Sequence, residues 1–303
     1  MQIIDGKKIR DEILKKVKAE VGALSFKPVF CDVLVGNDPA SLQYVQMKGR
    51  MAESVGISFH EADFSASIST EDLIKEIKVL NKIENMCGII IQLPLPEHID
   101  RQVVLDAIDS HLDVDCLGTI ASEKFYSGVS PVGFPTALAC MALLDSLNLN
   151  FEGKKIVVLG RGLLVGKPVA ALLQFRNLFP EIIRSKTENK EELIKQADII
   201  ISGIGKGKYI TGNMIKKGAV LIDAGTSEDN GSLDARRSIV GDVDLESVKD
   251  VAEYVSPVPG GVGPVTVAML LNNVLTVAKS FPLHQEKGKS PSPGVGEEGK
   301  HYE

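Results

Sequence analysis

Hydrophobic residues recur at every fourth position near the start of the chain, at Ile9, Ile13, Val17 and Val21, and most positions between them are charged. This spacing brings the apolar side chains onto one face of a helix. The pattern therefore predicts an amphipathic helix over the first 24 residues.

Strand-like and helix-like segments alternate after this helix. The run PVFCDVLVG ends at Gly36 and predicts a strand. A helix over Pro39–Val55 should follow, because proline is favoured in a first helical turn. Another helix is predicted over Ser69–Asn81, where Ser69 followed by Asp72 resembles a capping box. The run CGIIIQLPLP then indicates a buried strand, and the alternation predicts an α/β fold with a mainly parallel sheet.

A second unit begins with a predicted helix over Thr136–Leu147. Short apolar runs follow at 154–160, 197–202 and 218–225, and each is separated from the next by a helical or polar segment. This arrangement is typical of a Rossmann-like domain. The last apolar segment, 265–280, predicts a helix that could pack back on the first domain.

These elements divide the chain into parts. A length of 303 residues suits about two domains. We expect a catalytic α/β domain over 1–134 that includes a returning C-terminal helix at 265–281. A Rossmann-like domain is expected over 135–264. Residues 282–303 are polar and rich in Gly, Pro and Ser, which predicts a disordered tail.

Composition excludes several classes of protein. Hydrophobic residues make up 44% and charged residues 24%, the balance of a well-cored globular protein. The net charge of −6 and the lack of Lys/Arg-dense runs argue against a nucleic-acid partner. No apolar stretch is expected to reach the length of about 18 residues that a membrane span requires. The N-terminal segment turns polar too early for a secretory signal.

The cysteines and histidines carry no metal or disulfide signature. Cys31, Cys87, Cys116 and Cys140 are far apart and form no CxxC pair. Free thiols in a reducing compartment are the simplest interpretation, which favours the cytoplasm. The five histidines form no pair at metal-ligand spacing, so no metal is expected.

A glycine-rich turn indicates a dinucleotide site. GRGLLVGKP follows the predicted strand that ends at Gly160 and precedes a helix. Glycines allow a phosphate to approach the backbone, and a helix N-terminus favours its negative charge. The spacing is GxGxxxG, so an ordinary strand-to-helix turn is the alternative. The candidate cofactor residues in the turn are Gly160, Arg161, Gly162, Val165 and Gly166.

Residues after the next strand favour NADP over NAD. An NAD site usually presents an acidic residue there to hold the ribose hydroxyls. This chain presents Arg184 and Ser185, with Arg161 in the turn itself. A guanidinium beside a hydroxyl suits a 2′-phosphate. The alternative is that Arg184 is a solvated surface charge.

Four further segments contain candidate chemistry: GNDPASLQYVQMK, IIIQLPLP, LDVD and SPVPGGVGPVTVAML. Tyr44 and Lys48 are four residues apart, so they are neighbours on one helix face. They offer an aromatic surface beside an ammonium group, which suits a flat heterocycle. Gln92 follows a strand, at the edge where α/β sheets bind ligands. Asp115 can accept two hydrogen bonds from an amino-pyrimidinone edge.

In order and composition these segments resemble the bifunctional methylenetetrahydrofolate dehydrogenase/methenyltetrahydrofolate cyclohydrolase (FolD) family. The resemblance covers residues 2–280, and the strings YVxxK and PVPGGVGPxT are highly specific to it. The GDVD stretch at Gly241–Asp244 agrees as well. The resemblance implies an NADP-dependent enzyme of one-carbon metabolism that forms a homodimer and acts on tetrahydrofolate derivatives, including polyglutamylated ones.

The resemblance also implies roles for single residues. Tyr44 would stack on the folate, Lys48 would be the catalytic lysine, Gln92 its partner and Asp115 the pterin anchor. Further folate contacts would come from Leu93, Pro94, Pro257, Pro259, Gly260 and Gly261. Thr226 would contact the cofactor. The dehydrogenase step would pass a hydride from the methylene carbon to the nicotinamide. The cyclohydrolase step would add water to the methenyl carbon, with Lys48 in acid–base transfer.

Some residues depart from the family pattern. Cys116-Leu117-Gly118 follows Asp115, Phe134-Pro135-Thr136 replaces most of a PCTPxG string, and Gly162 and Arg184 stand where Ser and His are common. Three alternatives stay open: a dehydrogenase without cyclohydrolase activity, a two-domain dehydrogenase of the shikimate or amino-acid type, and a non-enzymatic dinucleotide-binding protein. A non-enzymatic protein would be expected to lose Lys48, Gln92 or Asp115, and all three are present.

Overall fold

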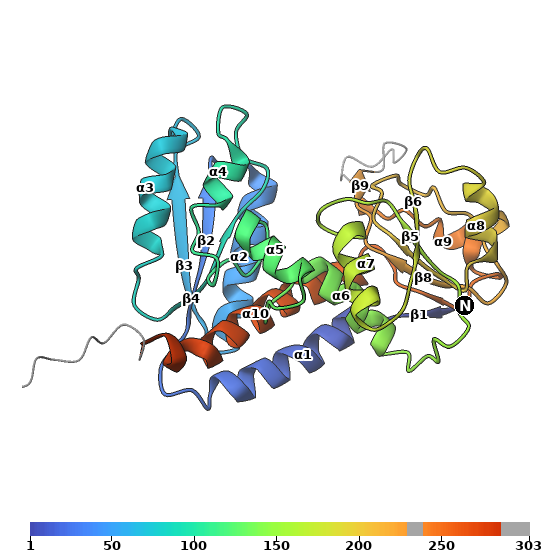
Figure 1. Cartoon of the computed structure of the whole chain (residues 1–303), viewed down its shortest axis with the longest axis horizontal. Helices are drawn as coiled ribbons and strands as arrows, with labels where there is room; N and C mark the ends of the chain where they lie inside the picture. The colour runs from blue at the N-terminus through green and yellow to red at the C-terminus, as the bar shows by residue number, and fades with distance from the viewer. Residues whose placement is uncertain (229–238, 286–303) are drawn as a thin grey trace, which may run out of the picture.

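The computed structural model describes residues 1–228 and 239–285, and it has two α/β lobes joined by long helices (Figure 1). The first lobe contains a three-stranded parallel sheet in the order β3-β2-β4. The second contains a six-stranded parallel sheet in the order β1-β11-β8-β7-β5-β6. The predicted α/β class, with mainly parallel sheets, is confirmed.

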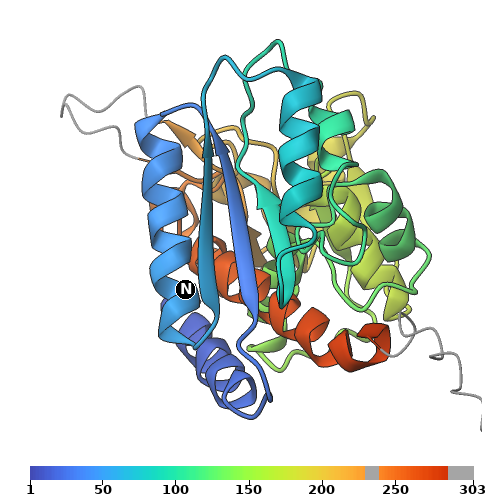
Figure 2. The same ribbon diagram turned by 90° about the vertical axis from the view of Figure 1, so that its left-hand side faces the viewer.

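The first sheet lies beside α2, and α10 passes along β4 (Figure 2). The elements of this lobe are α1 (Gly6–Val21), β2 (Val29–Val35), α2 (Pro39–Ser54), β3 (Ser58–Phe64), α3 (Thr70–Leu80), β4 (Met86–Ile91), α4 (Arg101–Leu105) and α5 (Thr119–Tyr126). The patterns did not predict β3. It is an edge strand with several exposed positions, so its sequence lacks a continuous apolar run.

Side-chain caps fix where the helices begin. The carboxylate of Asp5 accepts hydrogen bonds from the backbone N–H groups of Lys7 and Lys8, so α1 begins at Gly6 and not at the first residue. Ser69 accepts from the backbone N–H of Asp72 at 3.1 Å, as the capping-box pattern predicts. Its hydroxyl also donates to the Asp72 carboxylate, instead of that carboxylate reaching back to the Ser69 backbone.

The second lobe follows α6 (Pro135–Asp145), which begins one residue before the predicted helix. Its elements are β5 (Ile156–Leu159), α7 (Gly166–Phe175), β6 (Glu181–Ile183), α8 (Lys190–Gln196), β7 (Ile199–Ser202), a 3₁₀ turn η1 (Gly212–Met214), β8 (Val220–Asp223), β9 (Ser227–Glu228), β10 (Ile239–Val240), α9 (Leu245–Val248) and β11 (Tyr254–Val255). β9 and β10 form a separate antiparallel pair.

The N-terminal strand joins the second lobe, although the sequence assigned it to a helix of the first. β1 (Gln2–Ile3) pairs in parallel with β11, which places the N-terminus at the second sheet (Figure 1). Only two residues make this strand, so it shows no periodicity of its own. Its conformation is stabilised by a partner more than 250 residues away in the chain.

The long helix α10 (Val262–Gln285) packs against α1, α6 and β4. A Cβ atom at Gly88 of β4 would lie 2.9 Å from Val274 Cγ2, so the glycine allows this close approach. Asn273 is buried and donates to the carbonyls of Val114 and Gly133 at 2.8 and 2.7 Å. Through these bonds α10 ties the loop between α4 and α5 to the segment before α6.

Two sequence expectations about this helix need correction. The span Val262–Ser280 is long and apolar enough to cross a membrane, whereas the sequence analysis expected no stretch of that length. It reads as a core helix because most of it is buried against neighbouring elements. The helix also continues to Gln285, past the expected start of the tail at residue 282. Residues 286–303 of that tail lie outside the described residues.

Candidate active site

Lys48 and Tyr44 lie on one face of α2 but differ in burial. Asp38 caps the helix by accepting from the backbone N–H of Ser41 at 2.8 Å. Lys48 is 7% exposed, whereas Tyr44, one turn earlier, is 50% exposed. A Cβ atom at Gly49 would lie 2.6 Å from the ring of Phe59, so this glycine lets the helix lie close to β3. An accessible aromatic face therefore stands beside a buried ammonium group.

Two acceptors hold the Lys48 ammonium. Its Nζ donates to Gln92 Oε1 at 2.7 Å. The Gln92 amide is oriented by its own Nε2, which donates to the Leu93 carbonyl at 2.9 Å. On the other side, Nζ lies 2.6 Å from Asp32 Oδ2. The pairing of Lys48 with Gln92 agrees with the sequence expectation, whereas Asp32 was not among the predicted site residues.

The sequence does mark Asp32, as a charged residue inside an apolar run. It is the one charged residue in the run PVFCDVLVG, which becomes the central strand β2. Its side chain is fully buried. A carboxylate inside an apolar strand needs a compensating charge, because burying it alone is costly. That compensating charge is the ammonium of Lys48.

The loop between α4 and α5 presents Asp115 to the same cluster. Asp113, which is 1% exposed, accepts from the backbone N–H groups of Gly118 and Asp115 at 2.7 and 3.2 Å and so shapes the loop. Burial raises the pKa of Asp115 to about 7; the charges of Asp113 and Asp32 add to the rise, and Lys48 opposes it. Sequence reasoning missed Asp113, although it lies in the LDVD string.

The other predicted folate contacts lie in two proline-containing segments. Leu93 is partly buried and Pro94 is exposed, directly after Gln92. In the second segment, Gly261 N donates to the Pro257 carbonyl at 2.7 Å, which closes a tight turn around Pro259 and Gly260. The peptide bonds before Pro94 and Pro259 are cis. A Cβ atom at Gly6 would lie 1.9 Å from the Gly261 carbonyl oxygen, so the start of α1 packs directly on this turn.

The glycine-rich turn has the backbone geometry of a phosphate-binding loop. Gly160 has φ +90°, a conformation that side chains disfavour. A Cβ atom at Gly166 would lie 2.2 Å from the Gly160 carbonyl oxygen, so the turn requires glycine there. Arg161 and Gly162 are exposed, and no atom lies within 4 Å of a Cβ built on Gly162. Val165 packs beside Gly203, and α7 begins at Gly166. A phosphate can therefore reach the backbone at the start of α7.

The residues expected to read the ribose lie next to this turn. Gly160 N donates to the Ile183 carbonyl at 2.8 Å, so Arg184 and Ser185 follow directly beside the turn. Both are exposed, and the backbone N–H of Arg184 donates to Thr187 Oγ1. The Arg184 guanidinium is thus positioned on a fixed turn with its head in solvent.

Two buried carboxylates organise the loop that presents Thr226. Asp223 accepts from the backbone N–H groups of Gly225 and Asp242 at 2.9 and 3.0 Å. Asp242 in turn accepts from the backbone N–H of Ile204 at 2.8 Å. Burial raises the pKa of Asp223 to about 6. These contacts give the GDVD stretch a structural role and leave Thr226 exposed at the sheet edge.

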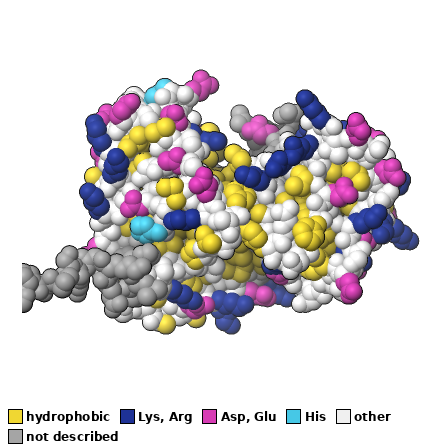
Figure 3. Space-filling model, viewed as in Figure 1, with side chains coloured by type: hydrophobic (Ala, Val, Ile, Leu, Met, Phe, Trp, Pro, Cys, Tyr) yellow, Lys and Arg dark blue, Asp and Glu magenta, His cyan; other side chains and the backbone are white. Residues whose placement is uncertain are grey.

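Contacts link the two halves of the site. Lys167 Nζ, from α7, lies 4.0 Å from the ring centroid of Tyr126 in α5. Tyr126 also interacts electrostatically with Arg161 of the turn and with Cys116, the residue after Asp115. The Asp115 loop and the glycine turn therefore lie on the same side of the molecule. Figure 3 shows a hollow between the lobes, with hydrophobic side chains in its floor and Lys and Arg side chains at its rim.

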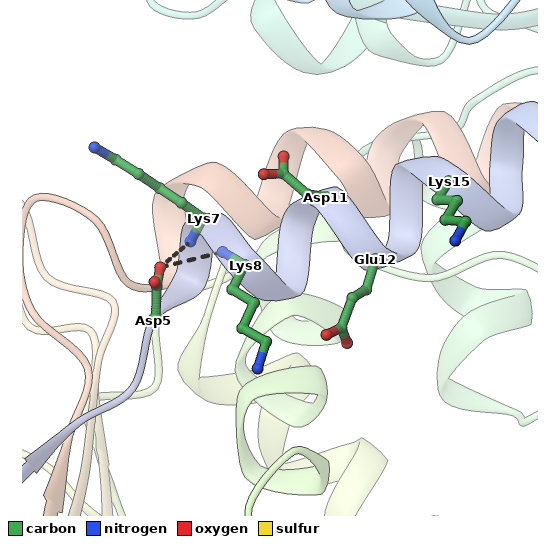
Figure 4. Close-up of a pocket in the computed structure, with 6 residues that line it drawn as sticks. All are labelled: Asp5, Lys7, Lys8, Asp11, Glu12 and Lys15. Atoms are coloured by element: carbon green, nitrogen blue, oxygen red, sulfur yellow. Dashed lines mark hydrogen bonds between the residues drawn. The ribbon is translucent and has the colours of Figure 1, made fainter.

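A second depression lies elsewhere and lacks these features. It follows the exposed side of α1, where Asp5, Lys7, Lys8, Asp11, Glu12 and Lys15 line it (Figure 4). Its acidic and basic side chains alternate, and it includes none of the predicted site residues. The depression on α1 is therefore separate from the candidate active site.

Two family models match the chain. Residues 4–115 match the catalytic domain of tetrahydrofolate dehydrogenase/cyclohydrolase, and residues 135–281 match the NAD(P)-binding domain of the same family. The Bifunctional protein FolD of Halothermothrix orenii is 42% identical over 92% of this chain and 98% of its own length. The FolD of Moorella thermoacetica is also 42% identical, over 92% and 99% of the two chains.

Solved structures of the family agree with the fold. The bifunctional FolD enzyme of Campylobacter jejuni superposes with a TM-score of 0.87 at 33% identity, over 93% of this chain and 99% of that one. The Trypanosoma brucei enzyme, solved with NADP and an inhibitor, gives 0.86 at 34% identity, over 93% and 98%. Together with the geometry of the hollow, these matches show that the chain belongs to the tetrahydrofolate dehydrogenase/cyclohydrolase family.

Proposed function

We propose that this protein oxidises 5,10-methylenetetrahydrofolate with NADP⁺ and hydrolyses the resulting 5,10-methenyltetrahydrofolate to 10-formyltetrahydrofolate. The observation that carries the proposal is the arrangement of Lys48, which is held between Gln92 and a buried carboxylate beside the exposed ring of Tyr44. The glycine turn lies on the same side of the molecule. A group that would transfer protons and a turn that would bind the dinucleotide thus lie around one hollow, which supports the proposal.

Four residues would hold and orient the folate. Tyr44 offers its exposed ring for stacking on the flat pterin. In its ionised form Asp115 accepts two hydrogen bonds from the amino-pyrimidinone edge. The turn containing Pro257 and Gly261 would line the far wall. The main contribution to the dehydrogenase step is then positioning, because the nitrogens beside the reacting carbon stabilise its positive charge.

The dinucleotide fits the turn at the start of α7. The open space at Gly162 and the tight backbone at Gly166 suit a pyrophosphate. NADP⁺ held there would supply the nicotinamide carbon to which the methylene hydride is transferred. Arg184 and Ser185 would hold the 2′-phosphate, with Thr226 at the neighbouring sheet edge.

In the hydrolysis step Lys48 would transfer protons. Water attacks the methenyl carbon and loses a proton as the new C–O bond forms. A proton is then delivered to the ring nitrogen N5 as the C–N5 bond breaks. The hydroxyl of the intermediate loses its remaining proton and becomes the C=O of the formyl group on N10. Lysine suits both roles because its amine accepts a proton and its ammonium donates one, and Gln92 keeps its Nζ in place.

One spectroscopic assay tests the proposal. The purified full chain is mixed with 5,10-methylenetetrahydrofolate and either NADP⁺ or NAD⁺, while both the methenyl product and its decay are followed. We expect formation of the methenyl compound with NADP⁺, followed by decay faster than in buffer. Formation without enzyme-dependent decay would favour the dehydrogenase-only alternative, and no formation with either nucleotide would contradict the proposal.

Replacing Arg184 by alanine is expected to raise the KM for NADP⁺ by about 10- to 100-fold, the loss typical of a charge-assisted contact. The KM for NAD⁺ should change little, because NAD⁺ lacks the 2′-phosphate. Steady-state kinetics with both nucleotides measures the difference. Lys186→Ala, which removes an exposed cation from the same turn, is the matched control. Equal losses for both nucleotides would contradict the assignment of Arg184.

Cellular location and assembly are part of the proposal. We infer a cytoplasmic homodimer that accepts polyglutamylated folates, from the family resemblance and from the four cysteines, which are buried free thiols. Light scattering at micromolar concentration tests the assembly, and a monomer at all concentrations would contradict it.

A further inference from the structure

Asp32 occupies the middle of the central strand of the first sheet. Its Cα partners are Glu61 in β3 and Ile90 in β4, so it is flanked by backbone on both sides. Its side chain is fully buried. Among residues 1–228 and 239–285 no donor makes a hydrogen bond of standard geometry to either carboxylate oxygen. The contact that compensates the carboxylate is the ion pair with Lys48 at 2.6 Å.

This ion pair completes the geometry around the Lys48 ammonium. An ammonium group has three N–H bonds. One donates to Gln92 Oε1, and the Asp32 carboxylate pairs with the ammonium as a charge at 2.6 Å. The lysine is thus held from two sides, by a neutral oxygen from the end of β4 and by a charged oxygen from β2.

We propose that Asp32 is a positioning residue for the hydrolysis step, whose carboxylate fixes Lys48 Nζ against Gln92 and supplies the negative charge opposite this lysine. The inference rests on the proposed function, because it assigns Asp32 a role in that reaction. Asp32 acts through the lysine and is itself shielded from the hollow by its burial.

The charges around the pair support this role. Burial raises the pKa of Asp32, and Lys48 opposes the rise. Glu61 and Asp63 of β3 add to the rise. Asp115, from the loop between α4 and α5, interacts with both members of the pair. Lys48 therefore lies among several carboxylates. Removing the charge of Asp32, with which it is paired, should alter proton transfer by the lysine.

The test is the pH–rate profile of methenyltetrahydrofolate hydrolysis by Asp32→Asn, which removes the charge and keeps the shape. An opposite charge within hydrogen-bonding distance shifts a titration by about 1–3 pH units. We therefore expect the kcat limb that depends on Lys48 to move at least one unit toward lower pH. The limb moves toward lower pH whether the ammonium or the free amine is the active form.

Asp32→Glu is the conservative control. It keeps the charge and adds one methylene group, so its midpoint should stay near that of the unmodified protein even if kcat falls. A purely structural role would lower the rate in both variants without moving the midpoint in Asp32→Asn alone. An unchanged midpoint in a hydrolysing Asp32→Asn enzyme would overturn the inference. No hydrolysis by the unmodified protein would instead overturn the proposed function.

A stability measurement covers the case in which Asp32→Asn folds poorly. Lys48→Met should lower the Tm at pH 8 by several degrees, because it leaves a buried carboxylate without its partner. Asp32→Asn in the Lys48→Met background should recover most of that loss. If Lys48→Met keeps the Tm of the unmodified protein at pH 8, or if the double variant recovers nothing, Asp32 is not the charged partner of the lysine.

Discussion

Lys48→Ala is expected to lower the rate of methenyltetrahydrofolate hydrolysis by about 10²- to 10⁴-fold, the range that general acid–base catalysis contributes. The physical reason is that the cluster then lacks the group that accepts the proton of water and returns one to N5. The Kd for NADP should stay nearly constant, because the glycine turn belongs to the other lobe. Stopped-flow hydrolysis and nucleotide titration measure the two quantities.

Lys48→Arg separates proton transfer from charge. A guanidinium keeps the positive charge opposite Asp32 but does not release a proton near neutral pH. We expect this variant to keep much of the stability that Lys48→Ala loses and still to hydrolyse slowly. Hydrolysis at the original rate in both variants would remove the lysine from the mechanism.

The second large effect is expected at Asp115. Asp115→Asn should raise the KM for the folate by about 100-fold, because two charge-assisted hydrogen bonds to the pterin are weakened. In the unmodified protein the carboxylate form becomes scarce below its pKa of about 7. The folate KM should therefore rise as pH falls from 7 to 5, by about tenfold per unit. This dependence should be flat in Asp115→Asn.

Ionisation of Asp115 favours folate binding, but it should lower the stability of the folded chain. Its pKa is higher in the folded chain, about 7, than the value of about 3.9 in an unfolded chain. The folded state thus binds more protons between these values, and stability falls as pH rises from about 4 to about 7. Asp115→Asn should therefore raise the Tm at pH 8, by about 2 °C or more, with little change at pH 4. A lower Tm at pH 8 would contradict the assignment of the raised pKa.

Much of the fold could be predicted locally. The helix predicted over Pro39–Val55 is confirmed as α2 within one residue, because its proline and its apolar spacing act within a few residues of chain. β3 escaped prediction because an edge strand with exposed positions resembles a loop. β1 escaped because two residues become a strand only when they pair with β11.

The candidate site likewise contains residues that the sequence indicates and one that only the packing brings into it. Tyr44, Lys48, Gln92 and Asp115 could be proposed from the sequence because each stands in a characteristic string. Asp32 stands in a strand that otherwise reads as core, and only the packing of α2 on β2 and β3 brings the lysine to it.

The amino-acid sequence by itself therefore determined the α/β class, the start of α2, α3 and α6 to within one residue and the glycine turn, and it indicated candidate reacting groups, since these depend on neighbours along the chain. The tertiary structure alone decided which sheet receives the N-terminal strand, how α10 ties the Asp115 loop in place, and which carboxylate pairs with Lys48. These features depend on burial and on contacts between distant segments, which a local pattern of residues does not encode.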